Sequence, residues 1–215
     1  MLRSSLAVLL LFIAQFLVPS TGYSALEDAR IIAEYKREQQ DRERPTNHAK
    51  VARHLVHQAD WAAVGSISTD SKIIGYPMVN MISIADSAKN GKSTGVIYFL
   101  LTDLDFTGND WKQTNKVSFF FSEEQLRNCS KQEIDPMEPT CARAMLSGQV
   151  QELNKTETEY TEASAAFLSR HPKASNWLKA HAFYLCKLNI EHIYVLDWYG
   201  GPHDVPVELY YQTDP

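Results

Sequence analysis

The stretch that decides the fold is residues 75–101, GYPMVNMISIADSAKNGKSTGVIYFLL. It contains two apolar runs, residues 77–85 and residues 95–101. The first run follows a Gly75-Tyr76 turn, and the polar segment between the runs contains Asn90-Gly91, a strong turn signal. Runs of this length that are bounded by turn residues are typical of strands. The stretch therefore predicts two consecutive strands with a polar connection.

Further strand and helix patterns lie on both sides of this stretch. Strands are predicted over residues 62–69, 116–121 and 142–153, and as a final pair over 183–188 and 193–199, separated by residues 189–192. Helices are predicted over residues 45–58, 107–115 and 156–169. Thr46 or Asn47 is the expected cap of the first helix. Short strands at close spacing with few helices favour a small β-barrel, so the predicted class is α+β, mainly β, with a single domain over residues 45–215.

The amino terminus predicts a cleavable secretory signal over residues 1–24. Arg3 supplies a positive start, residues 6–18 form an apolar run interrupted only by Gln15, and Pro19 is followed by small residues. Cleavage after Gly22 and cleavage after Ser24 fit equally well. The alternative is a membrane anchor, but the run is shorter than the roughly 20 apolar residues that a spanning helix needs. We expect no other membrane span, because no second long apolar run occurs.

Residues 25–44 are dense in charges of both signs and predict either a flexible arm or a solvated helix. The whole chain has 21 basic and 26 acidic residues, and removal of the signal would take away one basic residue, Arg3. An excess of negative charge argues against nucleic acid as a direct partner, because contact with phosphates needs a basic surface.

The chain has three cysteines. Cys129 and Cys141 flank a short loop, and in an oxidising compartment they are expected to form a disulfide that stabilises the fold by about 3 kcal/mol. The alternative is a pair of free, buried thiols. Cys186 lies in an apolar run and is expected to be a small buried hydrophobic residue rather than a nucleophile.

Two glycosylation sequons are present. They are Asn128-Cys129-Ser130 and Asn154-Lys155-Thr156. Asn154 follows a predicted strand in a polar stretch, where the modifying enzyme has access. Asn128 precedes a cysteine of the predicted disulfide, which would hinder modification. Both are candidate sites, and Asn154 is the stronger one.

Signatures of catalysis are scarce. The one candidate metal cluster is His54 and His57 with Asp60, because a spacing of three places both histidines on one side of a helix. Further ligands are not evident, and a polar helix face is the alternative. Asp197 is either a carboxylate with a raised pKa or a residue that accepts hydrogen bonds from the amides of Gly200-Gly201. The sequence therefore predicts no catalytic, cofactor-binding or metal site.

Taken together, these residues resemble the CREG family of secreted glycoproteins. The matching stretches occur in order over residues 45–211 and include Asp60-Trp61, Tyr98-Phe99, the loop from Cys129 to Cys141, Met145-Leu146-Ser147-Gly148, Asn154-Lys155-Thr156-Glu157, Arg170-His171-Pro172, and Val195-Leu196-Asp197-Trp198-Tyr199-Gly200-Gly201-Pro202. Each motif alone is unspecific, but the ordered set is specific. The chain departs from the family at Asn189-Ile190-Glu191, which lacks a sequon, and at Asn128 and Cys186.

The resemblance implies a split β-barrel of the pyridoxamine-phosphate-oxidase type that forms a homodimer. It also implies secretion, mannose 6-phosphate tagging of glycans, receptor-mediated delivery to the endosome and lysosome lumen, and roles in lysosomal function, growth restraint and differentiation. Members of the family are not thought to be enzymes. A secreted ligand that acts at a cell-surface receptor is a further possibility for such a protein.

An FMN-dependent oxidoreductase is the alternative that the fold suggests, since related barrels hold flavin mononucleotide. Such relatives bind the phosphate through basic residues on early strands, and a dianionic phosphate needs charge-assisted donors. Residues 77–85 contain no basic residue, and the next strand ends in the acidic Thr102-Asp103-Leu104-Asp105. The sequence therefore predicts that the phosphate-binding cluster, and with it the cofactor, is absent.

Overall fold

The computed structural model describes residues 25–42 and 44–215, which belong to two separate units. The predicted signal peptide, residues 1–24, lies outside the described residues. One unit contains helix α2 (Ala25–Arg42). Of the two forms expected for the charged segment, a flexible arm or a solvated helix, the structure has the helix. Ile31, Ile32 and Tyr35 of this helix are exposed.

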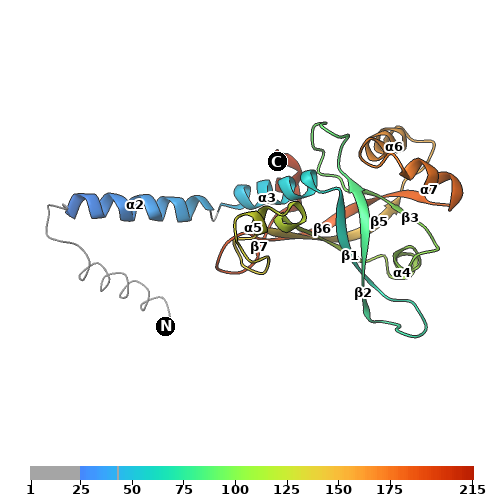
Figure 1. Ribbon diagram of the computed structural model, residues 1–215, viewed down its shortest axis with the longest axis horizontal. Helices are drawn as coiled ribbons and strands as arrows, with labels where there is room; N and C mark the ends of the chain where they lie inside the picture. The colour runs from blue at the N-terminus through green and yellow to red at the C-terminus, as the bar shows by residue number, and fades with distance from the viewer. Residues whose placement is uncertain (1–24, 43) are drawn as a thin grey trace. The chain divides into compact units, whose positions relative to one another are not determined.

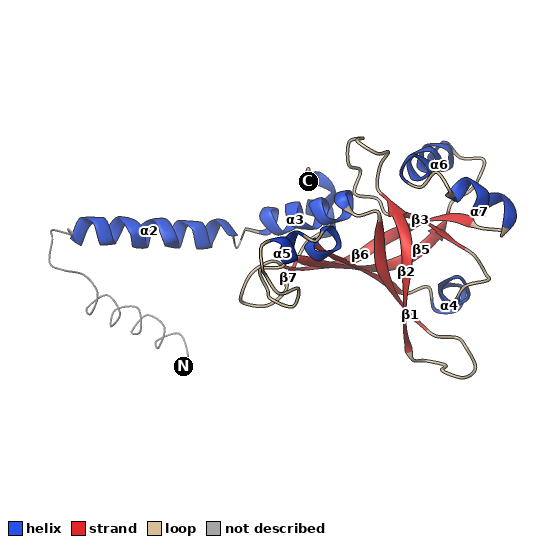
Figure 2. Ribbon diagram, viewed as in Figure 1, coloured by secondary structure: helices blue, strands red, loops and turns tan. Residues whose placement is uncertain are grey.

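The second unit is built on an antiparallel β-barrel (Figures 1 and 2). Its strands lie in the order β3-β2-β1-β4-β5-β6, and β3 also pairs with β6, which closes the barrel. The short strand β7 pairs with β6 beyond the barrel. The strands are β1 (Trp61–Ile67), β2 (Pro77–Ala85), β3 (Tyr98–Leu101), β4 (Val117–Ser122), β5 (Arg143–Glu152), β6 (Tyr184–Leu196) and β7 (His203–Asp204).

The alternation of side chains along these strands separates an apolar interior from the outer face. Val64, Phe119 and Leu146 are paired neighbours on β1, β4 and β5, and all three are buried in the main core. The residues next to them in sequence point outward, because successive side chains in a strand lie on opposite faces. The stretch 75–101 therefore folds as predicted, although its second strand, β3, begins only at Tyr98.

Helices cover the barrel at several places. Helix α3 inserts Ala52, Leu55 and Val56 into the main core, as its spacing predicts. The cap of α3 differs from the prediction, because Arg44 occupies the cap position and Pro45 the first turn, where its missing N–H is not needed. The helices of this unit are α3 (Pro45–Gln58), α4 (Phe106–Thr114), the 3-10 helix η1 (Glu123–Leu126), α5 (Asn128–Lys131), α6 (Thr158–Arg170), α7 (Ala174–Ala180) and α8 (Val207–Gln212).

The predicted final pair of strands is wrong. Residues 184–196 form one continuous strand, β6, which pairs with β5 from Cys186 to Leu196. The register shifts between Ser147 and Gly148, where Ser147 is opposite His192 and Gly148 is opposite Ile190. With this β-bulge, the polar Asn189, Glu191 and His192 remain in the strand with their side chains exposed. Polarity alone therefore gave a false break.

The predicted disulfide is present and joins Cys129 of α5 to Cys141, with their Cα atoms 5.7 Å apart. Both residues are buried. Cys186 is buried on β6, and burial raises the pKa of its thiol. A buried thiol with a raised pKa is a poor nucleophile, which agrees with its expected role in the core. Among the described helices, none combines the length and the apolar character that crossing a bilayer requires.

Candidate functional site

The three residues of the predicted metal cluster have separate partners. His57 lies with Nδ1 3.0 Å from Oδ1 of Asp86. The Nε2 atom of His54 is 3.4 Å from Oε1 of Glu123, and Asp60 is 3.5 Å from Arg170. His54 and His57 therefore do not converge on one ion, and the alternative of a polar helix face describes them better.

Asp86 is the centre of a buried polar network. Its side chain is fully buried and is contacted by His57, by Ser93 Oγ at 2.6 Å and by Arg170 Nη2 at 3.2 Å. These groups come from α3, from the β2–β3 connection and from α6. A buried carboxylate needs several donors to offset its desolvation, and here they tie three segments together. The network explains the position of α6 without a ligand.

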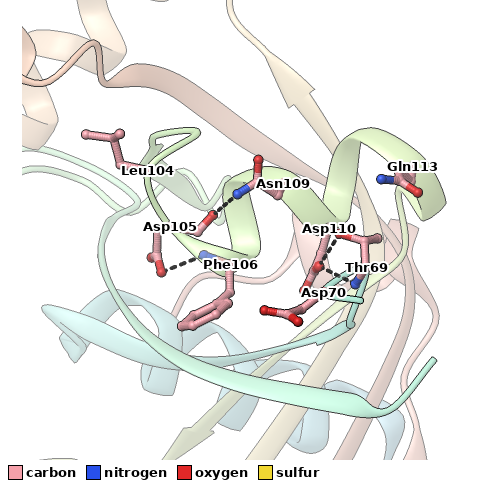
Figure 3. Close-up of a pocket in the computed structure, with 8 residues that line it drawn as sticks. All are labelled: Thr69, Asp70, Leu104, Asp105, Phe106, Asn109, Asp110 and Gln113. Atoms are coloured by element: carbon pink, nitrogen blue, oxygen red, sulfur yellow. Dashed lines mark hydrogen bonds between the residues drawn. The ribbon is translucent and has the colours of Figure 1, made fainter. Parts of the chain in front are cut away.

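An acidic pocket of about 340 Å³ lies between the β1–β2 connection and α4 (Figure 3). Its lining includes Asp70, Asp105 and Asp110 and no lysine or arginine. The buried Asp110 accepts hydrogen bonds from Ser66 Oγ at 2.7 Å and from the backbone N–H of Thr69 at 2.8 Å. These carboxylates serve the fold, and a pocket with this lining disfavours a phosphate.

Asp105 links this pocket to strand β2. It caps α4 by accepting from the backbone N–H of Phe106 at 2.8 Å, and its other oxygen accepts from Asn80 Nδ2 at 2.6 Å. A phosphate-binding cluster would lie on strand β2. There, the neutral amide of Asn80 instead donates to the carboxylate of Asp105.

The outer face of the barrel carries an apolar row, here called the outer stripe: Met81, Ala63, Phe120, Met145 and Tyr194. The register aligns these residues across β2, β1, β4, β5 and β6. Met81 is 66% exposed, Phe120 40% and Tyr194 43%. Val79 lies next to Met81 on the same face of β2 and is 70% exposed. An exposed row of apolar side chains of this kind is typical of an interaction surface.

The family is decided by a match that covers most of the chain. Residues 43–212 match the family model described as "CREG, beta-barrel". The chain belongs to the CREG family. Protein CREG1 of Gallus gallus is 34% identical over 172 residues, which are 80% of this chain and 88% of that protein. Protein CREG1 of Homo sapiens is 36% identical over 165 residues, 77% of this chain and 74% of that protein.

Solved structures show the fold of this CREG chain. A heme-binding protein from Mycobacterium smegmatis superposes with a TM-score of 0.60 at 16% identity, over 78% of this chain and 61% of that one. A Clostridium acetobutylicum protein of the pyridoxine-phosphate oxidase family superposes with a TM-score of 0.50 at 12% identity, over 77% of this chain and 99% of that one. The CREG chain is thus a split β-barrel of the expected type.

The two sequons of the CREG chain differ in their surroundings. Asn154 is exposed just beyond β5, and its Oδ1 accepts from Thr156 Oγ1 at 2.9 Å. Asn128 is half-buried, and its amide donates to Oε2 of Glu123 at 2.6 Å. The amide nitrogen that a glycan would occupy is therefore already engaged at Asn128. The geometry favours Asn154 as the accessible position.

Asp197 does not accept hydrogen bonds from the amides of Gly200-Gly201, which was one of its two expected roles. Its Oδ2 lies 3.0 Å from Nδ1 of His48, and its buried Oδ1 has no hydrogen-bond partner, so neither oxygen accepts from the turn amides. His203 stacks on the ring of His48. The sequence did not indicate that His48 and His203 lie beside Asp197, because His48 and Asp197 are 149 residues apart and no motif links them.

Proposed function

We propose that this CREG-family chain is a secreted, non-enzymatic, homodimeric glycoprotein of the endosome and lysosome lumen. It acts through protein partners, and its glycans are recognised by a mannose 6-phosphate receptor. In this role it supports lysosomal function and takes part in growth restraint and the control of differentiation. The observation that supports the proposal is the exposed apolar outer stripe, on a barrel that has an acidic pocket unsuited to a phosphate.

The outer stripe supports a homodimer. The stripe crosses five strands, and its most exposed part is on β2, where Val79 is 70% and Met81 66% exposed. Stable dimers place apolar residues at the centre of their interfaces. Two copies related by a two-fold axis would cover each other's stripes.

Mass measurement in solution tests the dimer. The wild-type chain is expected to sediment as a dimer, and Met81→Glu is expected to sediment as a monomer, because a buried unpaired carboxylate is costly. Leu104→Glu is the matched control, since Leu104 is 80% exposed but lies off the stripe. A monomeric wild-type protein, or a Met81→Glu variant that stays dimeric, would contradict the proposal.

Glycan-dependent sorting is tested in cells with the full chain. Asn154→Gln is expected to lose the mass of one glycan and to shift the protein from lysosomes to the medium. Asn128→Gln is the control and is expected to change neither. Unchanged lysosomal delivery of Asn154→Gln would count against glycan sorting, and a purely cytosolic or nuclear protein would count against secretion. Sequencing of the secreted amino terminus distinguishes cleavage after Gly22 from cleavage after Ser24.

A flavin-dependent oxidoreductase is the second candidate. The observation in its favour is the barrel shared with a member of the pyridoxine-phosphate oxidase family. The acidic lining beside β2 opposes it, because like charges repel the phosphate. An absorption spectrum of the native protein and a titration with flavin mononucleotide decide the matter. Flavin bands in the purified protein would overturn the non-enzymatic proposal.

A further inference from the structure

A buried histidine, a carboxylate and a second histidine meet where α3 packs against β7 and the end of β6 (Figure 1). His48 of α3 is only 3% exposed. Its Nδ1 lies 3.0 Å from Oδ2 of Asp197, just after β6. The ring of His203 on β7 stacks on His48, with the centroids 3.8 Å apart and the planes 9° from parallel.

Two polar atoms of this cluster are buried without a hydrogen-bond partner. They are Nε2 of His48 and Oδ1 of Asp197. An unpaired buried polar atom is costly, so each such atom requires an explanation. The hydrogen bond joins Nδ1 of His48 to Oδ2 of Asp197, and a metal ion bound by Nδ1 and a carboxylate oxygen would take the place of the shared proton.

The three side chains are close enough to share one ion. One nitrogen or oxygen atom from each of His48, Asp197 and His203 lies within 4.8 Å of the others. We propose that these residues bind a divalent transition-metal ion of the zinc type. Imidazole nitrogen and carboxylate oxygen are ligands that zinc takes, and three protein ligands leave a fourth position for water. His203 is half-buried on the two-residue strand β7 and lies beside His48.

The charge of the cluster suits a cation. The carboxylate of Asp197 supplies a negative charge, and one of its oxygens has no hydrogen-bond partner. The other group of potential ligands in the described residues is Glu124 with Cys129 and Cys141, but its sulfurs are joined in a disulfide and offer no thiolate.

Zinc titration of the tag-free, chelator-treated full protein at neutral pH, in competition with a chromophoric chelator, tests the site. The wild-type chain is expected to bind about one ion per chain. His203→Gln is expected to weaken binding by at least about 100-fold, and Asp197→Asn by about 10- to 100-fold. His54→Gln is the matched control, because His54 lies on the same helix with a different partner, Glu123.

The thermal midpoint supplies a second measurement. Zinc at about 100 times its dissociation constant is expected to raise the midpoint by about 5–10 °C in the wild type and in His54→Gln, but not in His203→Gln. Because His48 is buried, a His48→Gln variant that unfolds gives no separate result, and His203→Gln decides. Absence of saturable binding in the wild type, or unchanged zinc binding in His203→Gln, would overturn the site.

Discussion

At the scale of single residues, Gly148 shows how one position sets the path of a strand. A Cβ atom at Gly148 would lie 2.0 Å from the carbonyl oxygen of Asn189, which is far inside van der Waals contact. The bulge between β5 and β6 brings this backbone close. Glycine is therefore required here by close approach.

We predict that Gly148→Ala destabilises the barrel by about 3 kcal/mol, because neither backbone can move without disturbing the longest strand pairing. Gly65→Ala is the control, since its Cβ would meet Ser118 O at 3.8 Å and Met78 O at 3.9 Å, which are ordinary contacts. Urea unfolding of the two variants measures the difference. Equal stability of Gly148→Ala and the wild type would contradict the close approach of Gly148 to the carbonyl oxygen of Asn189.

The His54–Glu123 pair predicts a specific pH dependence. The hydrogen bond to Glu123 raises the pKa of His54, and the same contact lowers the pKa of Glu123. A raised histidine pKa stabilises the fold below about pH 6.5, and this stability is lost as pH rises through the folded-state pKa. The lowered carboxylate pKa stabilises the fold above about pH 4.5, and this contribution is lost as pH falls through the folded value.

We therefore expect His54→Gln to be less stable than the wild type between about pH 5 and 6.5 and equal to it at pH 8. His54 is 44% exposed, so screening by solvent limits the effect to at most about 1 kcal/mol. Thermal unfolding of both proteins, between about pH 5 and 6.5 and again at pH 8, measures the difference in stability. A difference that persists at pH 8 would show that packing, not charge, is lost.

At the scale of elements, the predictable strands are those whose apolar pattern coincides with turn residues. β2, β4 and β5 lie close to their predicted ranges for this reason. The sequence predicts two strands in place of β6 because Asn189, Glu191 and His192 are polar, and only the pairing with β5 shows that they continue the strand. Helix α8 was missed because Tyr210 is its one fully buried residue, anchored through its hydroxyl to Gly95 O at 2.8 Å.

The candidate sites also differ in whether the sequence alone could predict them. The disulfide pair was predictable, because the two cysteines lie close together in the sequence. The outer stripe was not, since its members come from five strands and meet only through register. The His48–Asp197 contact was hidden for the same reason, because tertiary structure alone brings the two residues together.

The cysteine loop also predicts a stability effect at this scale. Replacement of both Cys129 and Cys141 by serine is expected to lower the free energy of unfolding by about 3 kcal/mol, because the crosslink restricts the unfolded chain. Denaturant unfolding of the variant, beside reduced wild type, measures the loss. Reduced wild type should match the variant, and a variant as stable as the oxidised protein would contradict the prediction.

At the scale of the whole molecule, the two units are expected to fold independently. Helix α2 belongs to a unit distinct from the barrel. A chain that begins at residue 44 should therefore have the same thermal midpoint as one that begins at residue 25. Calorimetry of both compares them directly. A lower midpoint for the shorter chain would show that the helix contributes to the stability of the barrel.

The pairing of β3 with β6 fixes when the barrel can be completed. β6 follows the other five barrel strands in the sequence, so closure waits until all of them have been synthesised. Contacts between distant segments also form slowly. Asn154 precedes β6, and it leaves the ribosome while the cylinder is still open. A polypeptide made in this order would present Asn154, like Asn128, to the modifying enzyme before the barrel closes, and of these two residues only Asn154 remains exposed after folding.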